Sequence, residues 1–158
     1  MKRDAFIVDT KNNVGYLVHE DGGYTSFLVA TGQRRVVHYI GRTYNAQTPA
    51  RSWTVNSSEI KSDRITFGRQ GRFLRLTNNK DDLDTPYGIH SHAYVDKMLA
   101  GIDRYRSMGC IIVADTVLDN IIATFEMNDE KLNVVTLYGF GDQTVTDSLL
   151  RGIVAMNR

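Results

Sequence analysis

The residues of this sequence best suited to chemistry are its single cysteine and a histidine that precedes it. Cys110 follows Gly109 in a Ser-Met-Gly-Cys turn that leads directly into apolar residues. His90 ends an earlier Tyr-Gly-Ile-His run that predicts a short strand. A thiol attacks as its thiolate, and a nearby imidazole is the usual base that generates one near neutral pH. The pair therefore predicts nucleophilic catalysis by a thiol.

The alternative is that Cys110 is an inert core residue, because free cysteine is among the most buried residue types. Gly109 favours a functional turn, since glycine permits close approach of a ligand and backbone conformations that other residues avoid. Ser107 can hydrogen-bond the same turn locally. These two neighbours favour the catalytic interpretation.

The turn and the histidine resemble the catalytic motif of the L,D-transpeptidase (YkuD-like) domain, in which a histidine is followed at a distance by Ser/Thr-x-Gly-Cys. The matching residues here are His90, Ser91, Ser107, Gly109 and Cys110. Met108 stands where the family often has histidine. Ile112 stands two residues after the cysteine, where the family commonly has Arg or Asn. This second departure removes a polar group beside the nucleophile.

Two more segments are similar to the family, in the family's order. Residues 6–33, FIVDTKNNVGYLVHEDGGYTSFLVATGQ, resemble its first hairpin and the Thr-Gly turn that follows. Residues 48–55 resemble its Thr-Pro-x-Gly-x-aromatic-x-Val segment, with Arg51 in place of the usual glycine. Because the resemblance covers about residues 5–138, we expect a single catalytic domain over residues 1–158, with residues 139–158 as a C-terminal tail.

The resemblance implies a reaction and a set of roles. Cys110 is the implied nucleophile and His90 the general base, oriented by the main-chain carbonyl of Ser91. The backbone amides of Gly109 and Cys110 are expected to face the developing oxyanion. The implied substrate is a peptidoglycan tetrapeptide stem, cleaved before its terminal D-alanine to give a thioester. Transfer of the acyl group to an amine makes an L,D-transpeptidase, which we favour, and transfer to water makes an L,D-carboxypeptidase.

Neighbouring residues are expected to bind the stem or to compete for these roles. The candidate substrate-binding residues are Tyr87, His92, Arg106 and Ser107. Arg104 is a second cation able to hold a carboxylate. His92 is also an alternative base, although the Gly-Ile-His context matches the family at His90. The two histidines also have the His-x-His form of a metal pair, with Cys110 as a third ligand. No further ligand cluster is evident in the sequence, so we predict neither a metal nor another cofactor.

The elements that must position these residues are mostly short strands. β-rich runs predict strands at residues 5–9, 14–18, 24–30, 36–40, 52–55, 65–67, 72–76 and 132–138. Residues 41–51 predict a polar loop, 57–62 a turn or short helix, and 78–85 an acidic loop. Helical spacing predicts helices over residues 94–105, after a cap at Asp115 or Thr116, and over 146–156. Periodicity favours a mainly β barrel or sandwich, and the resemblance implies a β-sandwich with one or two helices near the cysteine.

Composition and charge exclude several classes of protein. With 158 residues, 42% of them hydrophobic and 23% charged, the chain suits one ordinary globular domain. A net charge of +1 gives no case for binding nucleic acid or an anionic membrane surface. No apolar run approaches ~18 residues, so no transmembrane helix is expected.

No signal peptide is visible at the N-terminus. We therefore expect the cell envelope or periplasm if an export signal is missing from this chain, and the cytoplasm otherwise. We expect a monomer that binds peptidoglycan stem peptides. The alternatives from other classes are a catalytically silent peptidoglycan-binding module and an effector acting on a competitor's wall. An ordinary cysteine protease is least favoured, because no Asn or Asp partner is identifiable.

Overall fold

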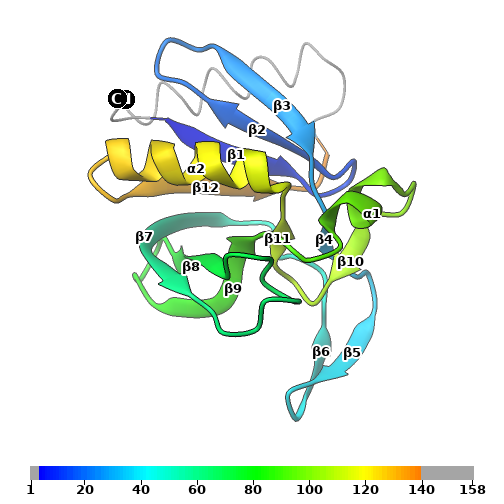
Figure 1. Ribbon diagram of the computed structural model, residues 1–158. Coiled ribbons are helices and arrows are strands. Elements are labelled where there is room, and N and C mark those ends of the chain that lie inside the picture. Colours follow the sequence, from blue (N-terminus) through cyan, green and yellow to red (C-terminus); the bar gives the residue numbers. More distant parts are fainter. Residues whose placement is uncertain (1–3, 140–158) are drawn as a thin grey trace.

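A computed structural model describes residues 4–139, and its main feature is one eight-stranded sheet that curls around an apolar core (Figure 1). The strand order is β11-β9-β8-β7-β12-β1-β2-β3. The strands of this sheet are β1 (Ala5–Asp9), β2 (Val14–Val18), β3 (Tyr24–Leu28), β7 (Ser52–Ile60), β8 (Arg72–Asn78), β9 (Asp84–His90), β11 (Ile111–Ile112) and β12 (Leu132–Leu137). The β1–β12 and β9–β11 pairs are parallel, and the others are antiparallel.

Two small sheets and two helices complete the described part of the chain. β4 (Thr31–Gly32) pairs with β10 (Tyr105–Ser107), and β5 (Val36–Tyr39) pairs with β6 (Arg42–Asn45). The helices are α1 (Val95–Ala100) and α2 (Asp115–Met127). The β5–β6 hairpin projects away from the large sheet (Figure 1). Neither described helix has the length and apolarity needed to span a bilayer.

The core lies between α2 and the curled sheet. Leu118, Ile121 and Phe125 recur every three or four residues on α2, so they share one face. They are buried in the same cluster as Trp53 of β7. Burying each such side chain contributes about 1.5–3 kcal/mol. The indole Nε1 of Trp53 donates to the hydroxyl of Thr136 at 3.0 Å, so its polar atom is satisfied inside the core.

The predicted mainly β fold, with one helix on each side of Cys110, is confirmed. The first helix is shorter than expected, because the chain leaves the helix at Gly101 and enters β10 at Tyr105. The prediction that Asp115 or Thr116 caps the second helix is wrong, because the helix begins at Asp115 and its N-cap is Ala114, without a side-chain cap. The helix predicted for residues 146–156, and the tail from residue 140 onward, lie outside the described residues.

The prediction of a strand at residues 65–67 is wrong, because these residues form a turn. The carboxylate of Asp63 accepts hydrogen bonds from the backbone amides of Ile65 and Thr66, both at 3.0 Å. The Asp63 carbonyl also accepts from the amide of Phe67 at 3.1 Å. An aspartate that binds the following amides offers the backbone an alternative to a strand ladder.

Two other segments predicted as irregular are strands. β7 continues to Ile60 with a bulge between Val55 and Ser58, because pairing with β8 outweighs the weak strand preference of its polar residues. The expected polar loop contains β6, because Ile40 and Gly41 take positive φ angles of 51° and 68° and turn the chain into a hairpin. Isoleucine is uncommon in that conformation, so the turn has no ordinary sequence signal.

Candidate active site

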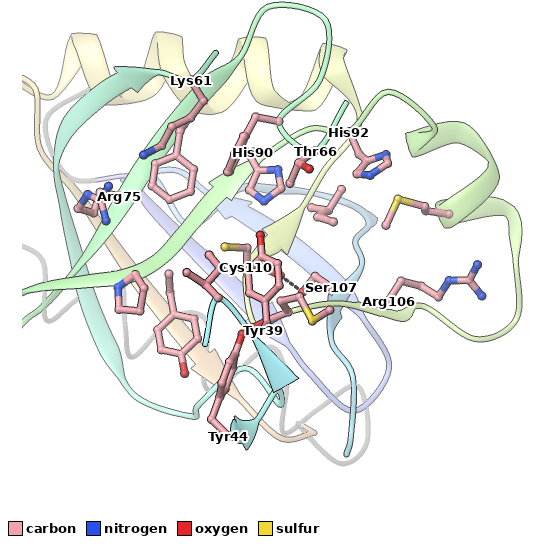
Figure 2. A pocket seen from close by; sticks show the side chains of 18 of the residues that line it. Tyr39, Tyr44, Lys61, Thr66, Arg75, His90, His92, Arg106, Ser107 and Cys110 are labelled. Carbon is pink, nitrogen blue, oxygen red and sulfur yellow. Dashed lines mark hydrogen bonds between the residues drawn. The ribbon is translucent and has the colours of Figure 1, made fainter. Parts of the chain in front are cut away.

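Parallel pairing of β9 with β11 brings Cys110 and His90 into one cavity. Ile111 lies opposite Ile89, and Ile112 lies opposite His90. Successive side chains of a strand point to opposite faces, and the first of these pairs is buried in the core. His90, Ile112 and the preceding Cys110 instead line a cavity of about 570 Å³ (Figure 2). A single strand pair thus brings together two residues that are 20 positions apart in the sequence.

The imidazole of His90 is held in one orientation. Its Nδ1 donates to the carbonyl oxygen of Ser91 at 2.5 Å, which leaves Nε2 as the proton acceptor. Phe67 packs edge-on against the ring at a centroid distance of 4.8 Å, and Phe73 stacks on it at 5.8 Å. The side chain is only 3% exposed, and this burial lowers the pKa of His90 to about 4. The ring is therefore neutral at pH 7 and able to accept a proton.

The turn before Cys110 is closed by hydrogen bonds of Ser107. Its hydroxyl donates to the carbonyl of Cys110 at 2.6 Å and accepts from the amide of Gly109 at 3.1 Å. The Gly109 amide is thus already occupied. No described residue accepts a hydrogen bond from the Cys110 amide, which makes it the available main-chain donor of the turn.

Gly109 is required by its surroundings. Its φ is +127°, and a Cβ at this position would lie 2.3 Å from the ring of Tyr87. Tyr87 in turn meets Trp53 edge-on at 5.8 Å. Tyr87 and Ser107, both predicted to bind substrate, line the cavity and also support the turn that carries the nucleophile.

A second anchor of the turn comes from the Thr-Pro segment. The hydroxyl of Thr48 donates to the carbonyl of Gly109 at 2.8 Å and accepts from the amide of Gly32 at 2.9 Å. Thr48 is 2% exposed, so neither bond competes with bulk water. One buried hydroxyl therefore joins the cysteine turn to β4.

Cys110 is a half-buried residue, and its thiol is protonated at neutral pH. Burial raises its pKa to about 11, opposed by a backbone hydrogen bond at Gly88 and by the charges of Arg75 and Lys61. A neutral thiol beside a neutral imidazole is suited to attack with simultaneous proton transfer, not to a preformed ion pair.

His92 lies past the end of β9, on the rim of the cavity. Its Nδ1 accepts a hydrogen bond from the amide of Tyr94 at 3.0 Å, so in the neutral ring the hydrogen is on Nε2. This makes His92 a donor toward the cavity and leaves His90 as the better placed base. The described residues contain no group of three His, Cys, Asp or Glu side chains arranged to hold a metal ion, so the metal-pair alternative lacks a geometric basis there.

Cations on the cavity wall differ in how they are bound. Arg75 donates to both carboxylate oxygens of Glu59, at 2.6 and 2.9 Å, and Lys61 lies 3.3 Å from the same carboxylate. The predicted Arg106 lines the cavity and has no hydrogen-bond or ion-pair partner among the described residues. Arg104 does not line it, because its guanidinium is used by the carbonyls of residues 12, 13 and 29.

Sequence reasoning missed one wall of the cavity. This wall belongs to the β5–β6 hairpin and contains Tyr39, Ile40, Arg42 and Tyr44. In Figure 2 the ring of Tyr39 crosses the cavity in front of Cys110, and its hydroxyl points toward His90. The available signal was the largely apolar run before Gly41 and the tyrosines on both sides of it, Tyr39 and Tyr44. The two rings around His90 were also missed, because Phe67 was assigned to a strand.

Solved structures support the fold. The L,D-transpeptidase (residues 123–326) of Xylanimonas cellulosilytica is similar, with a TM-score of 0.59 and 18% identity, over 85% of this chain and 60% of that chain. The helical cell shape determining protein Pgp2 of Campylobacter jejuni gives a TM-score of 0.59 at 15% identity, over 97% and 54%. The catalytic domain of the Enterococcus faecium L,D-transpeptidase gives 0.52 at 18% identity, over 87% and 98%. These likenesses confirm the predicted fold class.

Sequence comparison identifies the family. No curated protein sequence matches significantly. The chain spans only 60% and 54% of the Xylanimonas and Campylobacter structures, so it corresponds to part of those proteins. The family model for the L,D-transpeptidase catalytic domain (YkuD) matches residues 3–134, which is most of the chain. The chain therefore belongs to the L,D-transpeptidase catalytic domain (YkuD) family.

Proposed function

We propose that this chain is a peptidoglycan L,D-transpeptidase with Cys110 as the nucleophile and His90 as the general base. Its family acts on peptidoglycan stem peptides. The observation that carries the proposal is the pair itself. A thiol and a neutral imidazole line one cavity, and the Ser91 carbonyl fixes the imidazole with Nε2 unprotonated.

Attack begins when the thiol proton of Cys110 passes to Nε2 of His90. The sulfur bonds to the carbonyl carbon of the amide before the terminal D-alanine, and the carbonyl oxygen gains negative charge. The amide hydrogen of Cys110 is free to bind that oxygen, and one such donor contributes roughly 3 kcal/mol to the transition state. The Gly109 amide is held by Ser107, so it contributes to the shape of the turn.

The second half of the reaction returns the proton. The carbon–nitrogen bond breaks, the nitrogen of D-alanine takes the proton from His90, and a thioester remains on Cys110. His90, neutral again, then takes a proton from the acceptor amine as its nitrogen attacks the thioester, and the thiol is restored. If water attacks in place of the amine, the same steps make an L,D-carboxypeptidase.

The compartment that we propose follows from the reaction. Cross-linking of stems requires an enzyme in the cell envelope, so we propose the envelope for the transpeptidase. Release of D-alanine from recycled stems requires an enzyme in the cytoplasm, which is the compartment of the alternative carboxypeptidase.

The test is mass spectrometry of a disaccharide-tetrapeptide incubated with wild type or Cys110→Ala, with and without an added D-amino acid. We expect wild type to form dimers or to exchange the terminal D-alanine. Cys110→Ala is expected to lose roughly 10⁴-fold or more of this turnover, the scale of removing a nucleophile. Circular dichroism of both proteins checks that the variant is folded.

Other outcomes point elsewhere. Cysteine-dependent loss of D-alanine to water alone identifies the carboxypeptidase. Equal turnover by wild type and Cys110→Ala contradicts thiol catalysis. If neither protein changes the substrate, the non-catalytic peptidoglycan-binding module becomes the better hypothesis, and binding of the tetrapeptide to Cys110→Ala is then measured by calorimetry.

A further inference from the structure

One side of His90 is covered by an irregular segment that connects β7 to β8. This segment, residues 61–71, is called here the covering loop. Its two ends are tied together, because the amide of Lys61 donates to the carbonyl of Gly71 at 2.7 Å. Phe67 of the covering loop packs edge-on against the imidazole at a centroid distance of 4.8 Å. Lys61 and Thr66 line the same cavity (Figure 2). The base is therefore enclosed in part by a segment without a strand ladder of its own.

The covering loop also touches the segment that orients His90. The amide of Ala93 donates to the carbonyl of Ile65 at 2.9 Å. Gly68 packs so closely on the same segment that a Cβ there would lie 3.1 Å from the Cβ of Ser91. Ser91 supplies the carbonyl that accepts the hydrogen bond from Nδ1 of His90. The covering loop thus supports the imidazole both by ring contact and through the Ser91 carbonyl.

One exposed carboxylate closes the turn of the covering loop. The Asp63 carboxylate accepts from the backbone amides of Ile65 and Thr66, and the Asp63 carbonyl accepts from that of Phe67. A hydrogen bond from the Thr66 side chain, together with the amide bonds, lowers the pKa of Asp63, so the group is charged at neutral pH. Asp63 does not line the cavity. Its hydrogen bonds therefore shape the loop and do not contact a ligand.

The residues after Asp63 form this turn against their own preference. Isoleucine, threonine and phenylalanine favour strands, and Ile65, Thr66 and Phe67 follow one another here. Ile65 is 60% exposed, so core packing does not hold this end of the turn. An aspartate that binds the following amides stabilises a turn over a strand. Loss of the Asp63 carboxylate should therefore loosen the covering loop.

Resting on the function proposed above, we propose that Asp63 is a positioning residue for His90: it fixes the turn of the covering loop, and the loop keeps the imidazole oriented and shielded from water. Asp63 acts through Phe67 and through the segment that contains Ser91. The turn before Cys110 has separate anchors in Ser107 and Thr48, so it stays in place when the covering loop loosens.

The shielding of His90 has a measurable consequence. Burial is the main cause of its low pKa of about 4, opposed by the hydrogen bond to Ser91, and the charge of His92 adds a smaller lowering. Other titratable groups also line the cavity around the ring, from four different parts of the chain. They are Tyr39, Lys61, Arg75 and Cys110. Because burial is the main cause, water that reaches the ring should raise the pKa of His90 toward its ordinary value of 6.5.

The first measurement is an NMR titration of the histidine rings, in which the His90 signal is identified by its absence from His90→Gln. We expect His90 to titrate near pH 4 in wild type and at about pH 5 to 6 in Asp63→Ala. Asp63→Asn should stay close to wild type, because its amide oxygen can accept the same hydrogen bonds without a charge. Asp63→Ser keeps a shorter acceptor and should lie in between, which serves if Asp63→Ala does not fold.

The second measurement is kcat/KM for release of D-alanine from the donor stem, at pH 5 and pH 8. A base with a pKa near 4 is neutral at both, so the ratio of the two values should be near one in wild type. In Asp63→Ala we expect kcat/KM at pH 5 to be about threefold or more below that at pH 8, because part of the imidazole is then protonated.

A matched control is Asp81→Ala in the loop between β8 and β9. Asp81 is exposed, does not line the cavity, and accepts a hydrogen bond from the amide of Leu83 at 3.1 Å. The substitution therefore removes the same kind of turn bond from another loop. We expect it to leave both the His90 titration and the pH ratio unchanged.

The failures are distinguishable. If His90 still titrates near pH 4 in Asp63→Ala, or shifts equally in Asp81→Ala, the role of Asp63 is overturned. An equal shift in Asp63→Asn and Asp63→Ala would assign the effect to charge and overturn the capping role. If His90 titrates as expected but wild type releases no D-alanine, the proposed function fails, and Asp63 then positions a histidine that is not a base.

Discussion

The two walls of the cavity are built in different ways. One wall consists of β8, β9 and β11 of the large sheet, and it carries His90 beside Cys110, with the neighbouring isoleucines in the core. The other wall is the β5–β6 hairpin, which forms a sheet of its own and exposes 79% of Ile40. The groups that must hold a fixed geometry thus belong to the core. Other groups of the cavity lining belong to an exposed element.

A hydrogen bond connects the hairpin wall to the nucleophile turn. The hydroxyl of Tyr44 donates to the carbonyl of Met108 at 2.9 Å, and this bond is exposed. His90, in contrast, is enclosed by two aromatic rings and a carbonyl. Changes to the sheet wall should therefore affect the chemical step, and changes to the hairpin should affect substrate binding.

The largest contrast is expected from the two histidines. His90→Gln removes the group that accepts the thiol proton, and we expect kcat to fall about 10²–10⁴-fold, the usual contribution of a general base. His92→Gln removes only a donor on the rim, so we expect a change mainly in KM, of about tenfold or less. Steady-state kinetics of D-alanine release measures both.

The melting temperature of His90→Gln, compared with that of wild type, shows whether the variant is still folded. A variant that melts much earlier has lost its fold, and its kinetics then say nothing about a base. If His92→Gln loses more kcat than His90→Gln, the assignment of the base is wrong.

The pH dependence of activity tests whether His90 and Cys110 of the sheet wall are shielded from water. His90 must be neutral to accept a proton, and burial lowers its pKa to about 4. Activity is therefore expected to persist as the pH falls through 6.5 and to decline only near pH 4. Since burial raises the pKa of Cys110 to about 11, its alkylation by iodoacetamide should keep accelerating above pH 8.5.

Iodoacetamide has no titrating group, so its rate reports the thiol without interference from substrate carboxylates. An acid limb of kcat/KM near pH 6.5, together with alkylation that levels off near pH 8.5, would show that both side chains are well hydrated. The contrast between a buried sheet wall and an exposed hairpin wall would then be wrong.

The smallest effect is expected on the hairpin. Tyr44→Phe removes the hydroxyl that binds the Met108 carbonyl, and an exposed hydrogen bond of this kind contributes about 0.5–1.5 kcal/mol. We expect KM to rise by about twofold to tenfold with kcat unchanged, and hydrogen exchange at residues 36–45 to become faster. Tyr94→Phe, which removes an exposed hydroxyl outside the cavity lining, is the matched control. A fall in kcat without a change in KM would place the hairpin in the chemical step.

The sequence predicted the sheet wall better than the hairpin wall, for physical reasons. Alternating β-rich residues specify strands such as Ala5–Asp9 and Leu132–Leu137, and a glycine before a lone cysteine marks a turn. The cavity itself depends on pairing between distant segments, which local pattern does not encode. The aromatic rings around His90 come from the turn that Asp63 nucleates, so an error there concealed Phe67.

The hydrogen-bond partners of the arginines could not be predicted from the sequence either. Arg104 and Arg106 are equivalent by position, and only tertiary structure shows that the first is used by backbone carbonyls while the second faces the cavity. Arg42 was assigned to a loop because its turn places Ile40 at positive φ. Such a conformation is set by the hairpin as a whole.

The hydrogen bond between Gly32 and Thr48 also affects which part of this fold can vary. The amide of Gly32 donates to the Thr48 hydroxyl, so the two ends of the segment that contains the hairpin lie side by side. The same hydroxyl holds the turn before the cysteine. The segment between Gly32 and Thr48 can therefore change in length and charge while its two ends stay in place. His90 and Cys110 lie outside this segment, so such changes leave both residues in place.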